Sequence, residues 1–203
     1  ASDVYKRQGY NSGDYRAFYL RGDITATNNT TSYITQTGTD ASSGVQIGSS
    51  SISVTSGSRL IVATAFNNQP GTSSSLTKSG GGDLILTGTN AFSGNVSILA
   101  GNITLGDGGS TGSIPTSNTS TTTVGSGANF RFNLNSTVTF NGAIAGAGSV
   151  VQVGTGTTVL TNNNTYSGGT VISKGTLQIS TKSALGTGNV TINDADTGSA
   201  DTA

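Results

Sequence analysis

Short stretches of the chain alternate between hydrophobic and polar residues. Hydrophobic pairs two residues apart occur at Ile52 and Val54, Leu60 and Val62, Leu84 and Leu86, Val96 and Ile98, Ile103 and Leu105, Phe130 and Phe132, and Val138 and Phe140. A period of two places both members of a pair on one face of a β-strand. No helical period extends over ten or more residues, so the pattern predicts an all-β chain of short strands.

The segments between these strands have the composition of turns. Residues 88–94 (GTNAFSG) and 162–169 (NNNTYSGG) consist almost entirely of Gly, Asn, Ser and Thr around one aromatic residue. Gly and Asn accept positive φ angles, and Ser, Thr and Asn side chains form hydrogen bonds with the local backbone. We therefore expect compact turns at regular intervals.

The chain contains an internal repeat. Residues 75–105 align without a gap with residues 149–179, so a constant offset relates the two copies. The motif positions are Gly80, Gly82, Leu84, Leu86, Asn90, Phe92, Gly94, Ile98 and Gly101 in the first copy, and Gly154, Gly156, Leu160, Asn164, Tyr166, Gly168, Ile172, Gly175 and Leu177 in the second. Low complexity explains chance matches of Gly and Ser, but it does not keep aromatic and aliphatic residues in register.

Strands with a single inward stripe must stack on neighbouring repeats to bury that stripe. If the offset between the copies makes three circuits, each circuit takes about 25 residues, which suits a three-sided solenoid. We predict a single-stranded, right-handed parallel β-helix of about eight coils. A propeller is the structural alternative, although blade repeats of about 40–50 residues do not fit a whole number of times into the offset.

The composition is polar but almost uncharged. Gly, Ser, Thr and Asn make up more than half of the 203 residues, and 9% of the residues are charged. Low hydrophobicity is typical of disorder, but disordered chains usually also carry net charge and many Pro residues. Nine basic and nine acidic residues balance here, and the chain has two Pro. The balance disfavours a nucleic-acid partner, which requires a basic surface.

Several kinds of chemistry are excluded by the residues that the chain lacks. It contains no His, Cys, Met, Trp or Glu. Nucleophilic systems of the Ser-His-Asp and Cys-His types are therefore impossible, as are imidazole and thiolate metal sites. We expect no catalytic residues, no cofactor and no metal. No apolar stretch approaches the ~18–20 residues of a membrane helix.

Four regions are expected along the chain. Residues 1–8 (ASDVYKRQ) resemble a translated sequencing adapter and are predicted to be non-native. Residues 9–74 are expected to form N-terminal β-helix coils or an irregular β segment, and residues 75–192 a β-helix with both repeats. Residues 193–203 are interpreted as a truncated tail. The chain neither begins with Met nor shows a signal peptide, which suggests a fragment.

The repeats resemble a known family. Residues 80–94 and 153–179 are similar to the passenger-associated transport repeat of bacterial autotransporters. Residues 138–149 and 184–192 resemble the segments between such repeats. The resemblance covers residues 75–192 well and is specific for the repeat. The sequence departs from it at Asn95, where the second copy has Gly169, and at Thr158, where Leu is usual.

The resemblance implies a function. Autotransporter passengers are β-helical regions that a C-terminal β-barrel of the same polypeptide carries through the outer membrane to the cell surface. We therefore expect a non-enzymatic stalk that aids export and displays a distal adhesive or effector part. A direct adhesin that binds host or cell-surface glycans or matrix is a further alternative, which the sequence does not separate from a stalk. Low charge and the lack of disulfides suit threading of an unfolded chain, and each emerging coil can serve as the template for the next.

Two acidic motifs are candidate sites. Asp83 follows three Gly residues, as in a calcium-binding nonapeptide repeat, but one degenerate copy predicts a plain turn, and Asp107 is interpreted in the same way. Asp194 and Asp196 would share a strand face, as an acid–base pair requires. Polysaccharide lyases and hydrolases on β-helices use clustered Asp, so a carbohydrate-active enzyme is the alternative function. The sequence around this pair favours a solvated turn.

The remaining polar and aromatic patterns favour structural roles. Thr-x-Thr pairs are unevenly spaced, which argues against an ice-binding face, and eight Asn-x-Ser/Thr sites scarcely exceed the number expected by chance. Phe92 and Tyr166 are predicted to brace turns rather than to stack against sugars.

Overall fold

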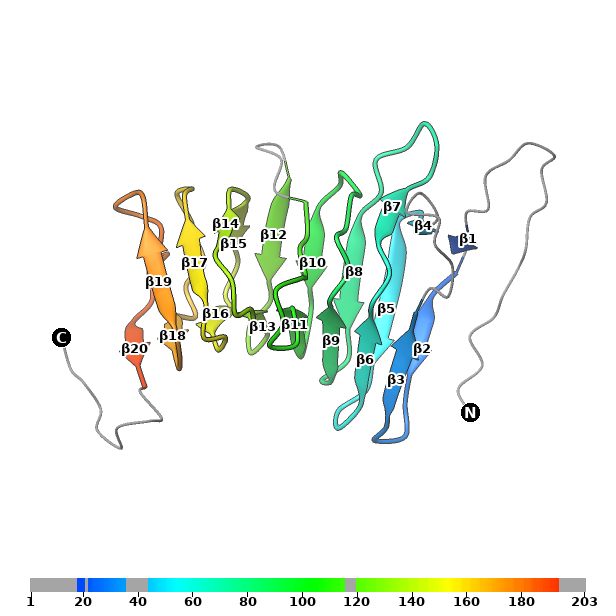
Figure 1. Ribbon diagram of the computed structural model, residues 1–203, viewed down its shortest axis with the longest axis horizontal. Coiled ribbons are helices and arrows are strands. Elements are labelled where there is room, and N and C mark those ends of the chain that lie inside the picture. Colours follow the sequence, from blue (N-terminus) through cyan, green and yellow to red (C-terminus); the bar gives the residue numbers. More distant parts are fainter. Residues whose placement is uncertain (1–17, 21, 36–43, 116–119, 194–203) are drawn as a thin grey trace.

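The computed structural model describes residues 18–20, 22–35, 44–115 and 120–193, so the predicted adapter segment 1–8 lies outside the described residues. Within these ranges every regular element is a β-strand, as the alternating pattern predicts. All strand pairs between named strands are parallel. The strands follow one another in chain order along the long axis of the molecule (Figure 1). The predicted parallel β-helix is confirmed.

The strands form three faces, each continued from coil to coil. The first face is a six-stranded sheet of β2 (Ile24–Ala26), β5 (Ser50–Val54), β8 (Leu76–Ser79), β10 (Val96–Ile98), β12 (Thr121–Val124) and β15 (Ala143–Ala145). The second face is an eight-stranded sheet of β3 (Thr31–Ile34), β6 (Arg59–Val62), β9 (Asp83–Leu86), β11 (Asn102–Leu105), β13 (Asn129–Phe132), β16 (Ser149–Gln152), β18 (Thr170–Ile172) and β20 (Val190–Ile192).

The third face consists of two three-stranded sheets. The N-terminal sheet contains β1 (Phe18–Leu20), β4 (Val45–Ile47) and β7 (Phe66–Asn68). The C-terminal sheet contains β14 (Val138–Phe140), β17 (Thr157–Leu160) and β19 (Thr176–Ile179). From β4 on, each of these strands follows a second-face strand in the chain. Isolated parallel bridges, Asn67 to Ala91 and Thr89 to Ser113, continue the face between the two sheets.

The inward positions of all three faces form one narrow hydrophobic core. Leu84, Leu86, Ile98 and Leu160, four of the aliphatic motif residues, are fully buried, as predicted. Three Phe rings, those of Phe130, Phe132 and Phe140, pack edge to face with centroids 4.8–5.6 Å apart. Burying such side chains contributes about 1.5–3 kcal/mol each, so a thin supply of hydrophobic residues is enough for a slender rod.

A circuit within either repeat is shorter than the sequence predicted. Val96 pairs with Leu76, and Asn102 pairs with Asp83. The second repeat has the same spacing, because Thr170 pairs with Val150 and Thr176 pairs with Thr157. Outside the repeats the circuit is longer in places, as between Ile24 and its partner Ile52. Turn segments of variable length on the outside of the rod account for the difference.

The offset between the copies is therefore not three whole circuits. Three successive strand pairings on the second face lead from Asp83 through Asn102 and Asn129 to Ser149. The repeat equivalent of Asp83 is Thr157, which lies beyond Ser149, around a corner, at the start of β17 on the third face. The prediction of three circuits is wrong by one face: the first repeat occupies the first and second faces, and the second repeat occupies the second and third.

Burial decreases at the far end of the stack. Ile172 and Leu177, which the motif predicts to lie inside, are only partly buried, and Ile179 is 51% exposed. Val190 and Ile192 on β20 are also exposed. The reason is that β19 and β20 have no strand on their outer edges within the described part of the chain.

Candidate functional site

The two repeats contain the same stacked glycine turn. Gly101 lies between β10 and β11 with a φ of +67°, and its equivalent Gly175 has a φ of +66°. A Cβ atom on Gly101 would overlap the carbonyl oxygens of Gly80 and Gly82 in the coil below. Gly175 stands in the same relation to the glycine turn below it. Only Gly combines this left-handed backbone with so close an approach of two coils.

A buried lysine lies beneath the glycine turn of the first repeat. Lys78 occupies an inward position of β8 and is fully buried. Its Nζ donates hydrogen bonds to the carbonyl oxygens of Ser79 (2.8 Å), Gly80 (2.6 Å) and Ala100 (3.1 Å). Burial lowers the pKa of this ammonium group to about 8, while the negative charge of Asp83 opposes the shift. Because Ala100 belongs to the next coil, Lys78 ties two coils together.

Gln152 takes the same place in the second repeat. Its Nε2 donates to the carbonyl oxygens of Gly154 (2.9 Å) and Gly156 (3.2 Å). Its Oε1 accepts a hydrogen bond of 2.7 Å from the hydroxyl of Thr158. Gln152 and Thr158 are both buried. Every polar atom of the amide is therefore paired, as a buried polar group requires.

An asparagine in each repeat replaces a strand in the ladder. The backbone N–H of Phe66 donates to Oδ1 of Asn90 (2.7 Å), and Nδ2 of Asn90 donates to the carbonyl oxygen of Ser113 (2.6 Å). Phe66 precedes Asn90 by one coil and Ser113 follows it by one coil. A side-chain amide has the same donor and acceptor as a peptide group, so this turn transmits the inter-coil hydrogen bonds although it is not a strand.

The second repeat reproduces this asparagine clamp on another face. The N–H of Ile144 donates to Oδ1 of Asn164 (2.8 Å), and Nδ2 of Asn164 donates to the carbonyl oxygen of Ala184 (2.6 Å). Ile144 belongs to the first face, whereas Phe66 belongs to the third. The asparagine clamp can therefore connect neighbouring coils on more than one face of the rod.

The aromatic residue two positions after each clamp is buried. Phe92 and Tyr166 are at most 1% exposed, which fits the predicted bracing role and leaves no ring surface for sugar stacking. The Tyr166 hydroxyl lies 2.6 Å from the Thr170 hydroxyl, which itself donates to the carbonyl oxygen of Leu185. Tyr166 is consequently the donor of the first bond. Burial raises the pKa of Tyr166, although the hydrogen bond with Thr170 opposes the shift.

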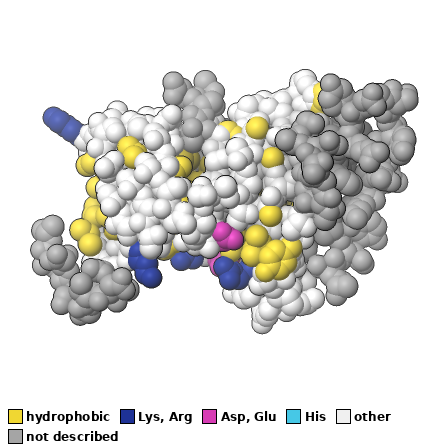
Figure 2. All heavy atoms as spheres, viewed as in Figure 1, with side chains coloured by type: hydrophobic (Ala, Val, Ile, Leu, Met, Phe, Trp, Pro, Cys, Tyr) yellow, Lys and Arg dark blue, Asp and Glu magenta, His cyan; other side chains and the backbone are white. Residues whose placement is uncertain are grey.

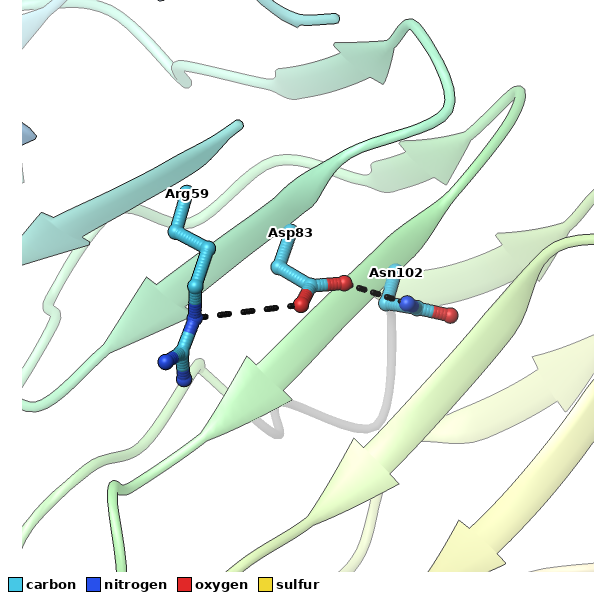
Figure 3. A network of polar contacts seen from close by, with 3 residues as sticks. All are labelled: Arg59, Asp83 and Asn102. Carbon is cyan, nitrogen blue, oxygen red and sulfur yellow. Dashed lines mark hydrogen bonds and ion pairs between the residues drawn. The ribbon is translucent and has the colours of Figure 1, made fainter. Parts of the chain in front are cut away.

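A polar ladder crosses four strands on the outside of the second face, and Figure 3 shows three of its residues, Arg59, Asp83 and Asn102. Nε of Arg59 lies 3.9 Å from one carboxylate oxygen of Asp83, and the amide of Asn102 donates to the other. Nδ2 of Asn129 in turn donates to Oδ1 of Asn102 (2.8 Å). Asp83 begins strand β9 and is not the turn residue that the sequence predicted. Its carboxylate joins strands, and no group of three metal-ligating side chains occurs among the described residues.

The other predicted polar positions are dispersed. Asp107 lies in a turn, where it accepts a 3.4 Å hydrogen bond from the N–H of Gly109. The pair of Asp194 and Asp196 lies outside the described residues. The face shown in Figure 2 is mostly uncharged where it is described, with a few charged side chains along its lower edge and one basic side chain at the upper left. The described residues contain no helix long and apolar enough to cross a membrane.

The sequence reasoning missed the buried corner residues. Lys78 and Gln152 each lie two positions after an inward aliphatic residue, Leu76 and Val150. The strand period of two therefore directs both inward. A polar residue at an inward position in both copies was the available signal. It is easily overlooked because Lys and Gln are normally exposed.

Two copies of one motif stacked within a parallel β-helix are typical of a repeat protein. The family described as Passenger-associated-transport-repeat matches residues 76–105 and 150–179, which lie within the two copies of the internal repeat. The chain is also 42% identical over 59 residues to the adhesin BmaC autotransporter of Brucella suis biovar 1 (strain 1330). No solved structure matches the chain.

The alignment to the adhesin covers 29% of this chain and 2% of the relative. The aligned stretch is thus a small part of the length of that relative. Residues 76–105 and 150–179 are thus similar to passenger-associated transport repeats, and part of the chain is similar to an autotransporter adhesin.

Proposed function

We propose that this chain is part of a β-helical stalk in which the two repeats start coil formation during export through the outer membrane. The stalk then displays more distal parts of the passenger at the cell surface or after release. The proposal rests on the construction of the repeats, on their match to the passenger-associated family and on the likeness to an autotransporter adhesin.

Each repeat contains its own template. In the first, β8 pairs with β10 and β9 pairs with β11. In the second, β16 pairs with β18 and β17 pairs with β19. Each repeat therefore supplies both partners of two strand pairs, one on each of two faces. Its short circuits keep the entropy of loop closure low, and local contacts allow growth coil by coil.

The observation that carries the proposal is the rotation of the repeats by one face. A motif that binds a ligand along a rod gains by presenting the same residues on the same side. Here the clamp asparagines of the two copies lie on different faces, whereas each makes the same kinds of contact with the coils before and after it. The motif therefore serves the stack and not one surface.

A non-enzymatic role is part of the proposal. Among the described residues, the carboxylate of Asp83 is engaged by Arg59 and Asn102, and the neighbouring ammonium of Lys78 is sealed in the interior. The Lys78 ammonium group is therefore not available to a substrate. No observation in the described residues favours a carbohydrate-active enzyme.

The implied partner is a C-terminal β-barrel translocator of the same polypeptide. An adhesive role is proposed on the likeness to the Brucella adhesin, with host or cell-surface glycans or matrix as the class of partner. Because the described residues form a regular rod, we place adhesion in other parts of the passenger.

Export tests the proposal. The chain is placed between a signal peptide and an autotransporter barrel, and surface exposure is measured by antibody labelling of intact cells. The double variant N90A/N164A lacks both clamps, and N163A changes an exposed neighbouring Asn. We expect the clamp variant to stall and to be degraded in the periplasm, while N163A is displayed normally. Normal display of the clamp variant, despite lowered stability of the purified chain, would overturn the proposed role in export.

A further inference from the structure

The geometry points to a coupled pair at the corner of each repeat. We infer that the inward residue under the glycine turn and the inward residue six positions later form one functional unit. An ammonium group at the first position is matched by an aliphatic residue at the second. An amide at the first position is matched by a hydroxyl at the second. The two pairs are Lys78 with Leu84, and Gln152 with Thr158.

The first pair is complete because Lys has donors only. An ammonium group carries three N–H donors and no acceptor. Carbonyl oxygens of Ser79, Gly80 and Ala100 accept from all three. Nothing remains that the facing residue must satisfy, and Leu84 fills the neighbouring core position with apolar atoms only.

The second pair is complete only with the hydroxyl. The Gln152 amide has two N–H donors, which bind the carbonyl oxygens of Gly154 and Gly156. It also has an acceptor oxygen that the glycine turn does not satisfy, and Thr158 supplies the donor. Leu at position 158 would leave that oxygen buried and unpaired, which is unfavourable in an apolar interior.

The coupling accounts for a difference between the two copies. Thr158 of the second repeat stands at the position that Leu84 occupies in the first. The Thr occurs in the copy that has Gln in place of Lys under the turn. The hydrogen-bonding groups of the corner residue thus determine which residue is favourable six positions later, and hydrophobicity alone does not.

This inference concerns the stability of a coil and does not depend on the proposed role in export. A chain whose repeats prove irrelevant to export would still show the coupling, and the reverse also holds. The two tests therefore fail separately.

Transplanting the pairs tests the inference on the full chain. The variants are K78Q, L84T and K78Q/L84T in the first repeat, and Q152K, T158L and Q152K/T158L in the second. Urea unfolding is followed by circular dichroism. We expect K78Q and T158L each to lower the urea midpoint of unfolding. K78Q/L84T should then unfold at a higher urea concentration than K78Q, and Q152K/T158L at a higher urea concentration than T158L.

The second cycle keeps the test decisive if K78Q does not fold. Folding of K78Q/L84T where K78Q is unfolded would itself support the coupling. If the stability changes of the two single variants simply add up in the double variant, the inferred coupling is overturned. Two independent packing changes in the core would add in this way, because neither compensates for the other. The control is L86T, which places the same hydroxyl at a neighbouring inward position that has no amide partner; L86T must not rescue K78Q.

Discussion

The Thr158 hydroxyl donates a 2.7 Å hydrogen bond to Oε1 of Gln152, and the two side chains are each 1% exposed. The bond lies inside the rod, beneath the glycine turn of the second repeat. A polar pair there is stable because donor and acceptor are matched without help from water.

Removing the Thr158 hydroxyl should destabilise the rod. T158V conserves shape but leaves the Gln152 oxygen unpaired, so the free energy of unfolding should fall by about 1–3 kcal/mol. Urea denaturation measures the change. The matched control is T157V, on the outer side of the same strand, which should change stability by less than about 0.5 kcal/mol. Equal effects of the two variants would contradict the assigned hydrogen bond.

Removing the clamp of the second repeat should have a larger effect. N164A leaves the N–H of Ile144 and the carbonyl oxygen of Ala184 unpaired in the interior, which should cost about 2–5 kcal/mol for the two groups together. N163A, at the exposed neighbour, is the control. Hydrogen exchange gives a local measurement: the Ile144 amide should lose protection in N164A. Retained protection of that amide would show that the asparagine is not its acceptor.

Substitutions at two glycines should distinguish the cost of backbone strain from the cost of a steric clash between coils. Gly127 has a φ of +73° with open space where a Cβ would lie, whereas Gly101 has a φ of +67° and the coil below in that place. G127A should cost about 1–2 kcal/mol, the strain of a left-handed residue. G101A should cost about 1–3 kcal/mol more, because the two coils must move apart. Thermal or urea unfolding of both variants tests the difference, and similar losses would argue against the close stacking.

Stability should depend on pH in the alkaline range through Lys78. Its pKa is about 8 in the folded chain, against an ordinary value near 10.4, so between these values the unfolded chain binds more protons. The free energy of unfolding should therefore rise as the pH increases from about 8 to about 10, by at most about 3 kcal/mol. Urea midpoints across this range test the slope, which the variant K78Q/L84T should lack.

Tyr166 should act in the opposite direction at higher pH. Burial raises its pKa above the ordinary value, so above about pH 10 the unfolded chain loses the proton first and stability falls. Y166F should reduce this alkaline loss while leaving the rise that Lys78 produces. An unchanged alkaline limb in Y166F would assign the loss to other groups.

The sequence pattern predicted which residues are buried in the rod better than it predicted the number of residues in each circuit. The period of two placed Leu86 and Leu160 correctly, because inward and outward positions differ so strongly in hydrophobicity. The length of a circuit depends on turns that point outward, and these vary without changing that pattern. The offset between the copies therefore looked like whole circuits although it ends one face further on.

The chemistry of the corners was less accessible to sequence reasoning. Asn90 and Asn164 were recognised as motif residues, but their role as substitutes for a strand depends on carbonyl and amide groups one coil away, which only the register supplies. Lys78 was missed because its burial depends on three backbone oxygens that no side-chain pattern reveals. Ile172 was expected inside, yet its environment depends on the next coil and not on its own strand.

The rotation of the second copy by one face has a consequence for how such rods change length. Deleting residues 75–148 would join Ser74 to a second copy that has the strands and clamp of the first, so the stack would close without a mismatch. The rod would then be shorter, and the part that follows the junction would be rotated by a third of a revolution about the axis. In a rod built this way, the gain or loss of one period alters the direction in which its tip points.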